Sequence, residues 1–277
     1  MIRAALALLL LLSAPAGAEP QRVVALGGTV TEIAAALGAA DRLVGRDSTS
    51  TYPAAVQALP DVGYLRALSA EGVLSLDPDL ILADPDAGPP EVVEQLKATG
   101  LAYIEVPGAY DAAGVAGRIT TVAEALARPA EGAALAAGVS AALQAAEARA
   151  AAIPAPRKRV MFILSLQGGR IMAAGQNTAA EAILALAGAD NALTGFDGYK
   201  PVTEEAVLAA APDAILMMDR GGDHATAEAD LWAMPALSGT PAATTGTLIR
   251  MEGLKLLGFG PRTPEAAQAL HDALYGG

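Results

Sequence analysis

The chain has 277 residues and a formal net charge of −12 at pH 7, with 30 acidic residues against 18 basic ones and no cysteine. This balance excludes a nucleic-acid partner, because binding to phosphates depends on clustered lysine and arginine. Without cysteine the chain has no disulfide, no thiolate metal site and no cysteine to carry a lipid.

Residues 1–18 have the pattern of a secretory signal peptide. Arg3 precedes an apolar run, and the small residues Ala16, Gly17 and Ala18 follow as a cleavage site. The apolar run of about ten residues is too short to span a bilayer, which needs about twenty. We therefore expect export to the periplasm as a monomer, with no lipid anchor and no segment embedded in the membrane.

The first part of the chain alternates predicted strands with predicted helices. RVVAL (22–26) predicts a strand, and the span from Thr29 to Glu32 has the capping-box pattern that begins a helix, which Gly38 ends. Further strands are expected at 79–83 and 101–106, with a helix from Pro89 or Pro90 to Thr99 between them. Such alternation predicts a parallel sheet covered by helices.

An alanine-rich helical stretch follows from 111 to 153, interrupted at Arg128 and Pro129. The order of the first part then resumes, with strands expected at 159–165, 214–218 and 247–251 and helices from about Thr178 and over 263–275. The expected domains are a signal peptide (1–18), an N-terminal α/β lobe (19–126), an interlobe helix (127–153) and a C-terminal α/β lobe (154–277).

An internal repeat supports two related lobes. EGVLSLDPDLIL (71–82) recurs as EAVLAAAPDAIL (205–216) with seven of twelve positions identical. An upstream pair, 33–45 and 183–195, matches at six of thirteen positions, but its offset is 150 and not 134. The first copy therefore holds sixteen extra residues upstream of Glu71, and this asymmetry points to function.

Tyr64 lies in this additional segment, two residues before Arg66. A phenolate oxygen is an axial ligand of ferric iron in some haem proteins. Because a phenol ordinarily loses its proton near pH 10, ligation at neutral pH needs a nearby positive charge, which Arg66 supplies if it donates a hydrogen bond to Tyr64. The alternative is a tyrosine that packs on its own lobe beside an exposed arginine.

Glu71 and Glu205 occupy equivalent places in the repeat, each the second residue after a hydroxyl side chain, Ser69 or Thr203, that can cap a helix. A carboxylate in the first helical turn stabilises the helix dipole by about 0.3–1 kcal/mol. Alternatively, one exposed acid on each lobe provides a two-point docking site for a membrane partner with paired arginines, which bind carboxylates bidentately.

Motifs typical of enzymes are missing from the sequence. It contains no phosphate-binding glycine motif, no G-x-S-x-G and no H-E-x-x-H, and its two histidines, His224 and His271, are far apart. The sequence therefore favours a binding protein over an enzyme. A periplasmic enzyme on a two-lobed α/β scaffold is the more remote alternative.

Four stretches carry a resemblance to a known family: RDSTSTYP, LPDVGYLRALSAEGVLSLDPDLILA, AAGQNTAAEAILALAGADNALTGFDGYKPVTEEAVLAAAPD and GLKLLGFGPRTPEA. They resemble the periplasmic haem-binding proteins of bacterial ABC haem importers, within a class that includes cobalamin- and siderophore-binding proteins. The resemblance implies two related α/β lobes with parallel-type sheets, one long interlobe α-helix and a ligand cleft between the lobes.

The resemblance also implies roles for individual residues. It places the axial haem ligand at Tyr64, with Arg66 as its arginine, and the acids that dock on the permease at Glu71 and Glu205. Haem is then a transported ligand and not a permanent cofactor. The implied partners are an inner-membrane ABC permease and, through it, an ATPase. An iron-siderophore or a corrinoid is the alternative ligand.

The sequence departs from this family at one loop. Some haem-binding members carry a histidine where this chain has Gln167, Gly168 and Gly169, so we expect no second iron ligand there. The glycine backbone and Met172 are expected to cover the porphyrin face. Arg170 and Arg250 are candidate contacts for the propionates. One bound haem and two stacked haems both stay open.

Overall fold

The computed structural model describes residues 19–167, 170–219 and 228–276. The predicted signal peptide, residues 1–18, lies outside these ranges. The strands are β1 (Val23–Leu26), β2 (Leu43–Arg46), β3 (Leu80–Ala83), β4 (Ala102–Glu105), β5 (Arg159–Gln167), β6 (Arg170–Ala174), β7 (Asp190–Asn191), β8 (Tyr199–Val202), β9 (Ala214–Asp219) and β10 (Leu248–Glu252).

The helices alternate with the strands in the first part of the chain, as the sequence predicts, but not throughout the second part. They are α1 (Gly28–Ala36), α2 (Ala70–Leu74), α3 (Pro90–Ala98), α4 (Ala112–Ala125), α5 (Pro129–Ala151), α6 (Ala179–Leu186), α7 (Glu204–Ala210), α8 (Glu228–Trp232), α9 (Pro235–Ser238), α10 (Pro241–Thr245), α11 (Gly253–Leu257) and α12 (Thr263–Tyr275), with short 3-10 helices η1 (Ala40–Arg42) and η2 (Ala54–Ala58).

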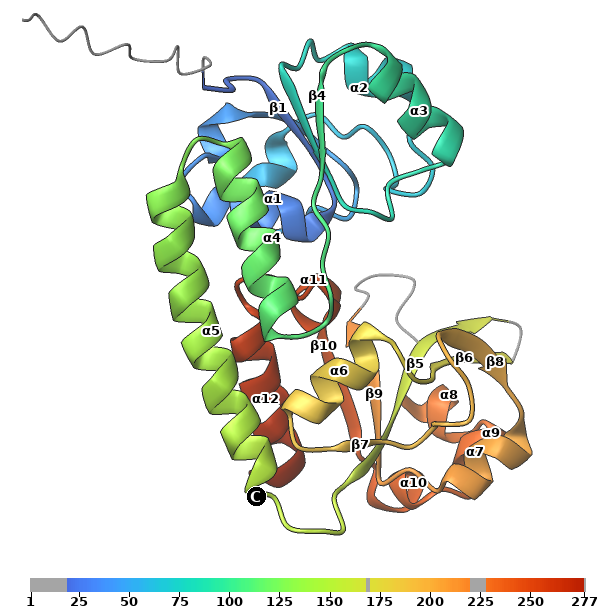
Figure 1. Cartoon of the computed structure of the whole chain (residues 1–277). Helices are drawn as coiled ribbons and strands as arrows, with labels where there is room; N and C mark the ends of the chain where they lie inside the picture. Colours follow the sequence, from blue (N-terminus) through green and yellow to red (C-terminus); the bar gives the residue numbers. More distant parts are fainter. Residues whose placement is uncertain (1–18, 168–169, 220–227, 277) are drawn as a thin grey trace, which may run out of the picture.

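Two sheets form two lobes that lie one above the other in Figure 1. The N-terminal lobe contains a parallel four-stranded sheet in the order β2-β1-β3-β4. The C-terminal lobe contains a six-stranded sheet in which β10, β9, β5 and β7 are parallel, but β6 and β8 are antiparallel to their neighbours. The sheets are thus of the parallel type that the sequence predicts, with β6 and β8 as an antiparallel addition at one edge. Since β6 follows β5 after two residues, it can pair with β5 only in the antiparallel direction.

The central strands of the N-terminal sheet are apolar at every position because both of their faces are covered. Val23 and Ala25 of β1 belong to the cluster that α1 and α4 complete, whereas Val24 and Leu26 pack with α2 and α3. β4 lies at the edge and is only partly buried. Its position explains its more polar sequence.

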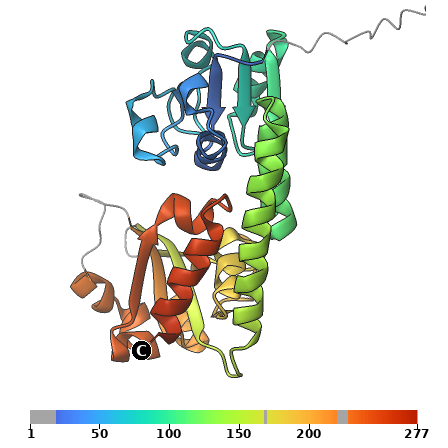
Figure 2. The same cartoon turned by 90° about the vertical axis from the view of Figure 1, so that its left-hand side faces the viewer.

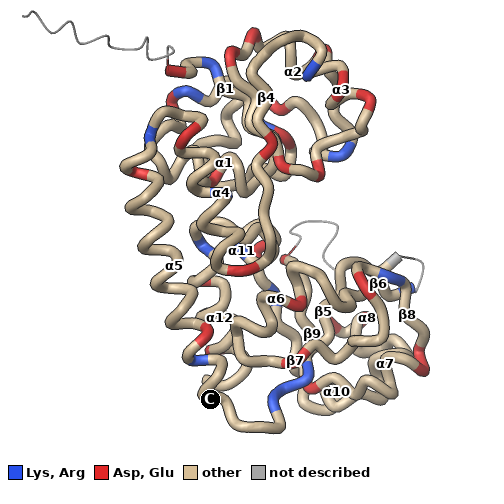
Figure 3. Tube along the Cα trace, viewed as in Figure 1, with Lys and Arg blue, Asp and Glu red and all other residues tan. Residues whose placement is uncertain are grey.

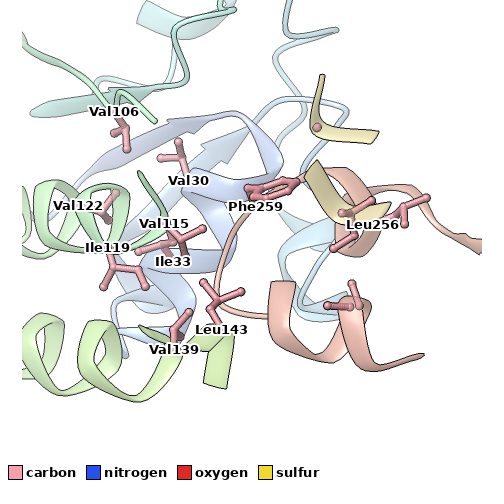
Figure 4. Packing of buried hydrophobic residues seen from close by; sticks show 14 of the residues in the cluster. Val30, Ile33, Val106, Val115, Ile119, Val122, Val139, Leu143, Leu256 and Phe259 are labelled. Carbon is pink, nitrogen blue, oxygen red and sulfur yellow. The ribbon is translucent and has the colours of Figure 1, made fainter. Parts of the chain in front are cut away.

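The long helix α5 runs alongside both lobes (Figures 1 and 2). Its 23 residues give a length of about 34 Å, and alanine, its commonest residue, has the highest helix propensity. α5 packs against α4 in one lobe and against α6 and α12 in the other. Its side chains Val139 and Leu143 belong to a hydrophobic cluster that also contains Ile33 from the N-terminal lobe and Leu256 from the C-terminal lobe (Figure 4). One core therefore joins the two lobes.

The start of α1 differs from the expected capping box. The helix begins at Gly28, and its N-cap has no side-chain hydrogen bond. The Thr29 hydroxyl instead donates to the Gly258 carbonyl at 2.7 Å, and the Glu32 carboxylate pairs with Arg262 at 2.8 Å. The capping-box prediction was wrong because both side chains bind residues from the far end of the chain, which local spacing does not reveal.

The internal repeat corresponds to equivalent structural units. Residues 71–82 cover most of α2 and β3, and residues 205–216 cover most of α7 and the start of β9. As predicted, the hydroxyls of Ser69 and Thr203 cap these two helices, accepting hydrogen bonds from backbone N–H groups at 3.3 and 3.2 Å. β3 pairs with β1 and β9 pairs with β5, both in parallel. The two lobes thus share a helix–strand unit placed in the same way.

Charged residues are scattered over both lobes, and lysine and arginine positions are spread along the described trace (Figure 3). In the part of the chain that the structure describes, no helix has the length and hydropathy that crossing a membrane requires.

Candidate functional site

The carboxyl ends of β1 in one lobe and β10 in the other lie close together. Gly28, just after β1, lies so close to Leu254, just after β10, that a Cβ atom on Gly28 would lie 2.7 Å from a Leu254 methyl carbon. Only glycine fits this approach. In open α/β sheets, ligands bind outside the carboxyl ends of the strands. The candidate site therefore lies between the lobes.

A loop of residues 61–68 presents Tyr64 on a framework of backbone hydrogen bonds. The Ser48 N–H donates to the Gly63 carbonyl at 2.9 Å, and the Gly88 N–H donates to the Leu65 carbonyl at 2.9 Å. Gly63 has a φ of +103°, a conformation that side-chain-bearing residues rarely adopt. These bonds tie the loop to the ends of β2 and β3.

Buried and exposed side chains alternate along this loop. Val62, Leu65 and Leu68 are at most 9% exposed and pack into the N-terminal lobe, whereas the Tyr64 side chain is 48% exposed. The apolar anchors fix the loop and leave the tyrosine ring open to a ligand.

Arg66 holds the phenolic oxygen of Tyr64. Its Nη1 donates to Tyr64 Oη at 3.0 Å, as the sequence spacing predicted, and its Nη2 pairs with the Asp86 carboxylate. Burial acts to lower the pKa of Arg66, but the hydrogen bonds to Tyr64 and Asp86 outweigh it and raise the pKa above its usual value. A charged donor of this kind stabilises a phenolate.

Asp84, just after β3, links Arg66 electrostatically to Arg118 of α4. Burial raises the pKa of the Asp84 carboxyl, while a hydrogen bond from the Asp86 N–H and the charges of Arg118 and Arg66 oppose the rise. Burial also lowers the pKa of Arg118, and the charge of Asp84 opposes that shift. These charges therefore form one connected set at the end of the N-terminal sheet.

Direct bonds connect the two lobes beside this set, and we call them the interlobe contact. On one side are Thr29, Glu32 and Arg118, and on the other are residues 258–262. Arg118 is 5% exposed and donates to the carbonyls of Gly258 at 3.4 Å and Phe259 at 3.0 Å. With the Thr29 and Glu32 bonds, the interlobe contact fixes the spacing between the two sheets.

Tyr199 faces this region from the C-terminal lobe. It is the first residue of β8, partly buried, with its ring edge against Phe162 at 6.3 Å between centroids. Burial raises the pKa of Tyr199, and the charges of Tyr110 and Arg66 also act on it. Tyr199 of the C-terminal lobe therefore interacts electrostatically with Arg66 of the N-terminal lobe.

Comparison with known proteins places the chain in a family. The family model described as periplasmic binding protein matches residues 23–253. The chain belongs to this family.

Solved structures of other periplasmic binding proteins resemble the whole described fold. The periplasmic haem-binding protein BhuT, in complex with two haems, is 46% identical with a TM-score of 0.86, over 91% of this chain and 97% of that chain. The haem-binding protein RhuT from Roseiflexus sp. RS-1, in apo form, is 39% identical with a TM-score of 0.88, over 92% and 98% of the two chains. An uncharacterised ABC transporter substrate-binding lipoprotein of Bacillus subtilis, YvrC, is 27% identical over 259 residues, 93% of this chain and 81% of that protein.

The candidate docking acids of this periplasmic binding protein lie on separate lobes. Glu71 on α2 and Glu205 on α7 are both exposed and are both the second residue of their helix. The pKa of Glu205 lies below its usual value because its own backbone N–H and the Thr203 hydroxyl donate to the carboxylate. Glu205 is therefore negatively charged at neutral pH.

The remaining candidates from the sequence lie in the C-terminal lobe. Gln167 is the last residue of β5 and lies opposite Arg170 in the antiparallel β5–β6 register. Arg170 is exposed at the start of β6, and Met172 lies further along β6. Arg250 lies on β10, which β9 and β5 separate from β6, so the structure does not bring Arg250 next to Met172. Gly168, Gly169 and His224 lie outside the described residues.

Sequence reasoning missed Arg118, Arg262 and Tyr52. The guanidinium carbon of Arg262 lies 3.7 Å from the centroid of the Tyr52 ring, and Arg262 also pairs with Glu32. No local signal marks these residues, because the contacts join segments more than 100 residues apart. An arginine at an apolar helix position, Arg118 beside Ile119, is the one hint that the sequence offers.

Proposed function

We propose that this protein captures ferric haem in the periplasm and delivers it to an inner-membrane ABC importer, without catalysing a reaction. The observation that carries the proposal is the exposed Tyr64 ring, whose oxygen accepts a hydrogen bond from Arg66 on a loop at the carboxyl end of the N-terminal sheet. The solved relatives that are 46% and 39% identical are both haem-binding proteins, which supports this ligand.

Tyr64 binds the iron through its phenolate oxygen in this proposal. Arg66 stabilises the negative oxygen at neutral pH, and Asp86 keeps the guanidinium in position. Burial of the apolar macrocycle between the lobes supplies most of the affinity, at about 25 cal/mol per Å² of apolar surface removed from water. The iron bond adds selectivity for a ferric ligand.

The other candidates take supporting roles. Met172 covers the macrocycle from the C-terminal lobe, and Arg170 and Arg250 are the candidate contacts for the propionates. Glu71 and Glu205 dock on the permease. In this proposal residues 1–18 direct export, and the chain offers no cysteine for a lipid, whereas the Bacillus relative is named a lipoprotein.

Titration with hemin tests the proposal through Tyr64→Phe. We expect the variant to lose the visible band of the iron–tyrosinate bond and to bind hemin at least about tenfold more weakly, because the phenolate oxygen is gone. Tyr103→Phe is the matched control, since Tyr103 lies on β4 with its ring against Lys97, and it should bind as the wild type does. An unchanged Tyr64→Phe spectrum contradicts the iron ligand.

Thermal melting with each candidate ligand tests the choice of haem. A ligand that binds the folded state raises the melting temperature. We expect hemin to raise it and neither a ferric siderophore nor cyanocobalamin to do so. Stabilisation by one of the latter, with none by hemin, overturns the ligand assignment.

A further inference from the structure

Four large hydrophobic side chains are exposed among the described residues, and three of them are tyrosines: Tyr52 at 43%, Tyr64 at 48% and Tyr110 at 43%. The fourth, Leu208, lies on α7. Tyr64 has a role in the proposed function, but Tyr52 and Tyr110 have none so far. Large aromatic rings exposed beside a binding region call for an explanation.

Each of the three tyrosines is paired with an arginine. Arg66 donates to the Tyr64 oxygen, whereas the other two arginines lie near the rings, with guanidinium carbons 3.7 Å (Arg262) and 5.9 Å (Arg118) from the ring centroids of Tyr52 and Tyr110. These separations are within the range of cation–π attraction. Arg66 therefore acts on the phenolic oxygen of Tyr64, whereas Arg262 and Arg118 contact the aromatic rings of Tyr52 and Tyr110.

The ring-holding arginines are themselves fixed. Arg262 pairs with Glu32 at 2.8 Å and with Glu252 at 3.5 Å. Arg118 donates to the Gly108 carbonyl at 3.1 Å and, in the interlobe contact, to the Phe259 carbonyl at 3.0 Å. The Tyr110 ring also packs edge-on against Phe259, with centroids 5.2 Å apart. Both rings are therefore held in place before any ligand binds, which reduces the entropy lost on binding.

The two rings come from opposite edges of the N-terminal sheet. Tyr52 follows β2 and Tyr110 follows β4, the edge strands of the order β2-β1-β3-β4. Three interstrand spacings separate these edges by about 14 Å. The Tyr64 loop is bonded to Gly88, after the central strand β3. Tyr52 and Tyr110 therefore follow the two edge strands at the end of the sheet that also carries the Tyr64 loop.

We propose that Tyr52 and Tyr110 form an aromatic contact set that binds the flat face or edge of the macrocycle independently of its iron. This inference rests on the proposed function. It assigns different roles to two kinds of tyrosine: Tyr64 selects the metal, and the rings of Tyr52 and Tyr110 select a planar aromatic ligand over a non-planar one. Aromatic contacts of this kind contribute about 0.5–1.5 kcal/mol each beyond area burial, which corresponds to about two- to tenfold in affinity.

Titrations with hemin and with iron-free protoporphyrin IX separate the two roles. We expect Tyr52→Leu and Tyr110→Leu each to weaken both porphyrins by a similar factor of about two to ten. Tyr64→Phe should weaken hemin alone. Tyr52→Phe and Tyr110→Phe keep the rings and should bind both porphyrins nearly as the wild type does. Leu208→Ala, an exposed apolar side chain on α7, is the matched control.

The outcomes are distinguishable. If both leucine variants bind the two porphyrins with wild-type affinity, the contact set is refuted while haem capture stands. If the phenylalanine variants lose as much affinity as the leucine variants, the hydroxyls bind the ligand and the ring contact is refuted. If the wild type binds neither porphyrin, the proposed function itself fails. Tyr110→Leu leaves the Arg262–Glu32 pair intact, so it carries the test if Tyr52→Leu does not fold.

Discussion

The two lobes share a helix–strand unit but differ in the segment that precedes it. In the N-terminal lobe, residues 47–69 form a long loop region with η2 and carry Tyr52, Tyr64 and Arg66. In the C-terminal lobe the corresponding segment is sixteen residues shorter and contains β8, with Tyr199 at its start. The repeated parts supply the sheets and the equivalent acids, while the unequal parts supply different side chains to the interlobe region.

The proposed docking acids belong to the shared unit and the proposed iron ligand to the unequal segment, and charge reversal at the shared positions tests whether docking and ligand binding are separate. We expect Glu71→Lys with Glu205→Lys to abolish delivery to the permease, because two carboxylates that bind arginines become repelling charges. Each single reversal should retain part of the activity. Haem transport into vesicles that contain the importer is the measurement, with hemin affinity measured in parallel.

A double reversal at two other exposed first-turn acids, Glu91→Lys with Asp230→Lys, controls for net charge. Transport equal to that of the wild type in the Glu71 and Glu205 double variant refutes the docking role. A parallel loss of hemin affinity shows that the shared unit and the ligand site are not separate.

The comparison also shows how far the sequence predicts the molecule. The apolar central strands, the helix break at Arg128 and Pro129, and the equivalence of Ser69 and Thr203 all follow from local pattern. The Tyr64–Arg66 hydrogen bond was predictable because the two residues are neighbours in the chain.

The interlobe contact was not predictable in the same way. Glu32 and Arg262 are 230 positions apart, and a single sequence gives no reason to pair them. The capping-box pattern at Thr29 and Glu32 even favoured a different role, because short-range rules assign a partner within the helix. Tertiary contacts override such local preferences when the side chains are buried between lobes.

The variant Arg118→Met tests whether the interlobe contact stabilises the connection between the lobes in addition to α5. The variant keeps an apolar stem but removes the donors to the carbonyls of Gly108, Gly258 and Phe259. We expect the free energy of unfolding to fall by about 2–4 kcal/mol, because buried acceptors lose a charged donor. Urea unfolding followed by circular dichroism measures this loss.

Arg128→Met is the matched control for Arg118→Met. Arg128 faces Glu131 at 3.7 Å, with the glutamate half exposed, and such pairs contribute about 0–1 kcal/mol. If the two variants lose the same stability, the Arg118 bonds add nothing to the connection that α5 provides.

The smallest expected effect is on the pH dependence of stability, and it comes from partly buried tyrosines, Tyr103 in the N-terminal lobe and Tyr199 in the C-terminal lobe. Burial, with the charges of Glu105 and Glu94, raises the pKa of Tyr103 to about 12, and burial raises the pKa of Tyr199 as well. Because the folded state disfavours the phenolate, this contribution to stability is full below pH 10 and falls as the pH rises from 10 through 12. Tyr103→Phe should therefore flatten the decline of the unfolding free energy over this range. A decline that stays as steep as in the wild type contradicts the shift, and spectrophotometric titration of the tyrosinate band measures it directly.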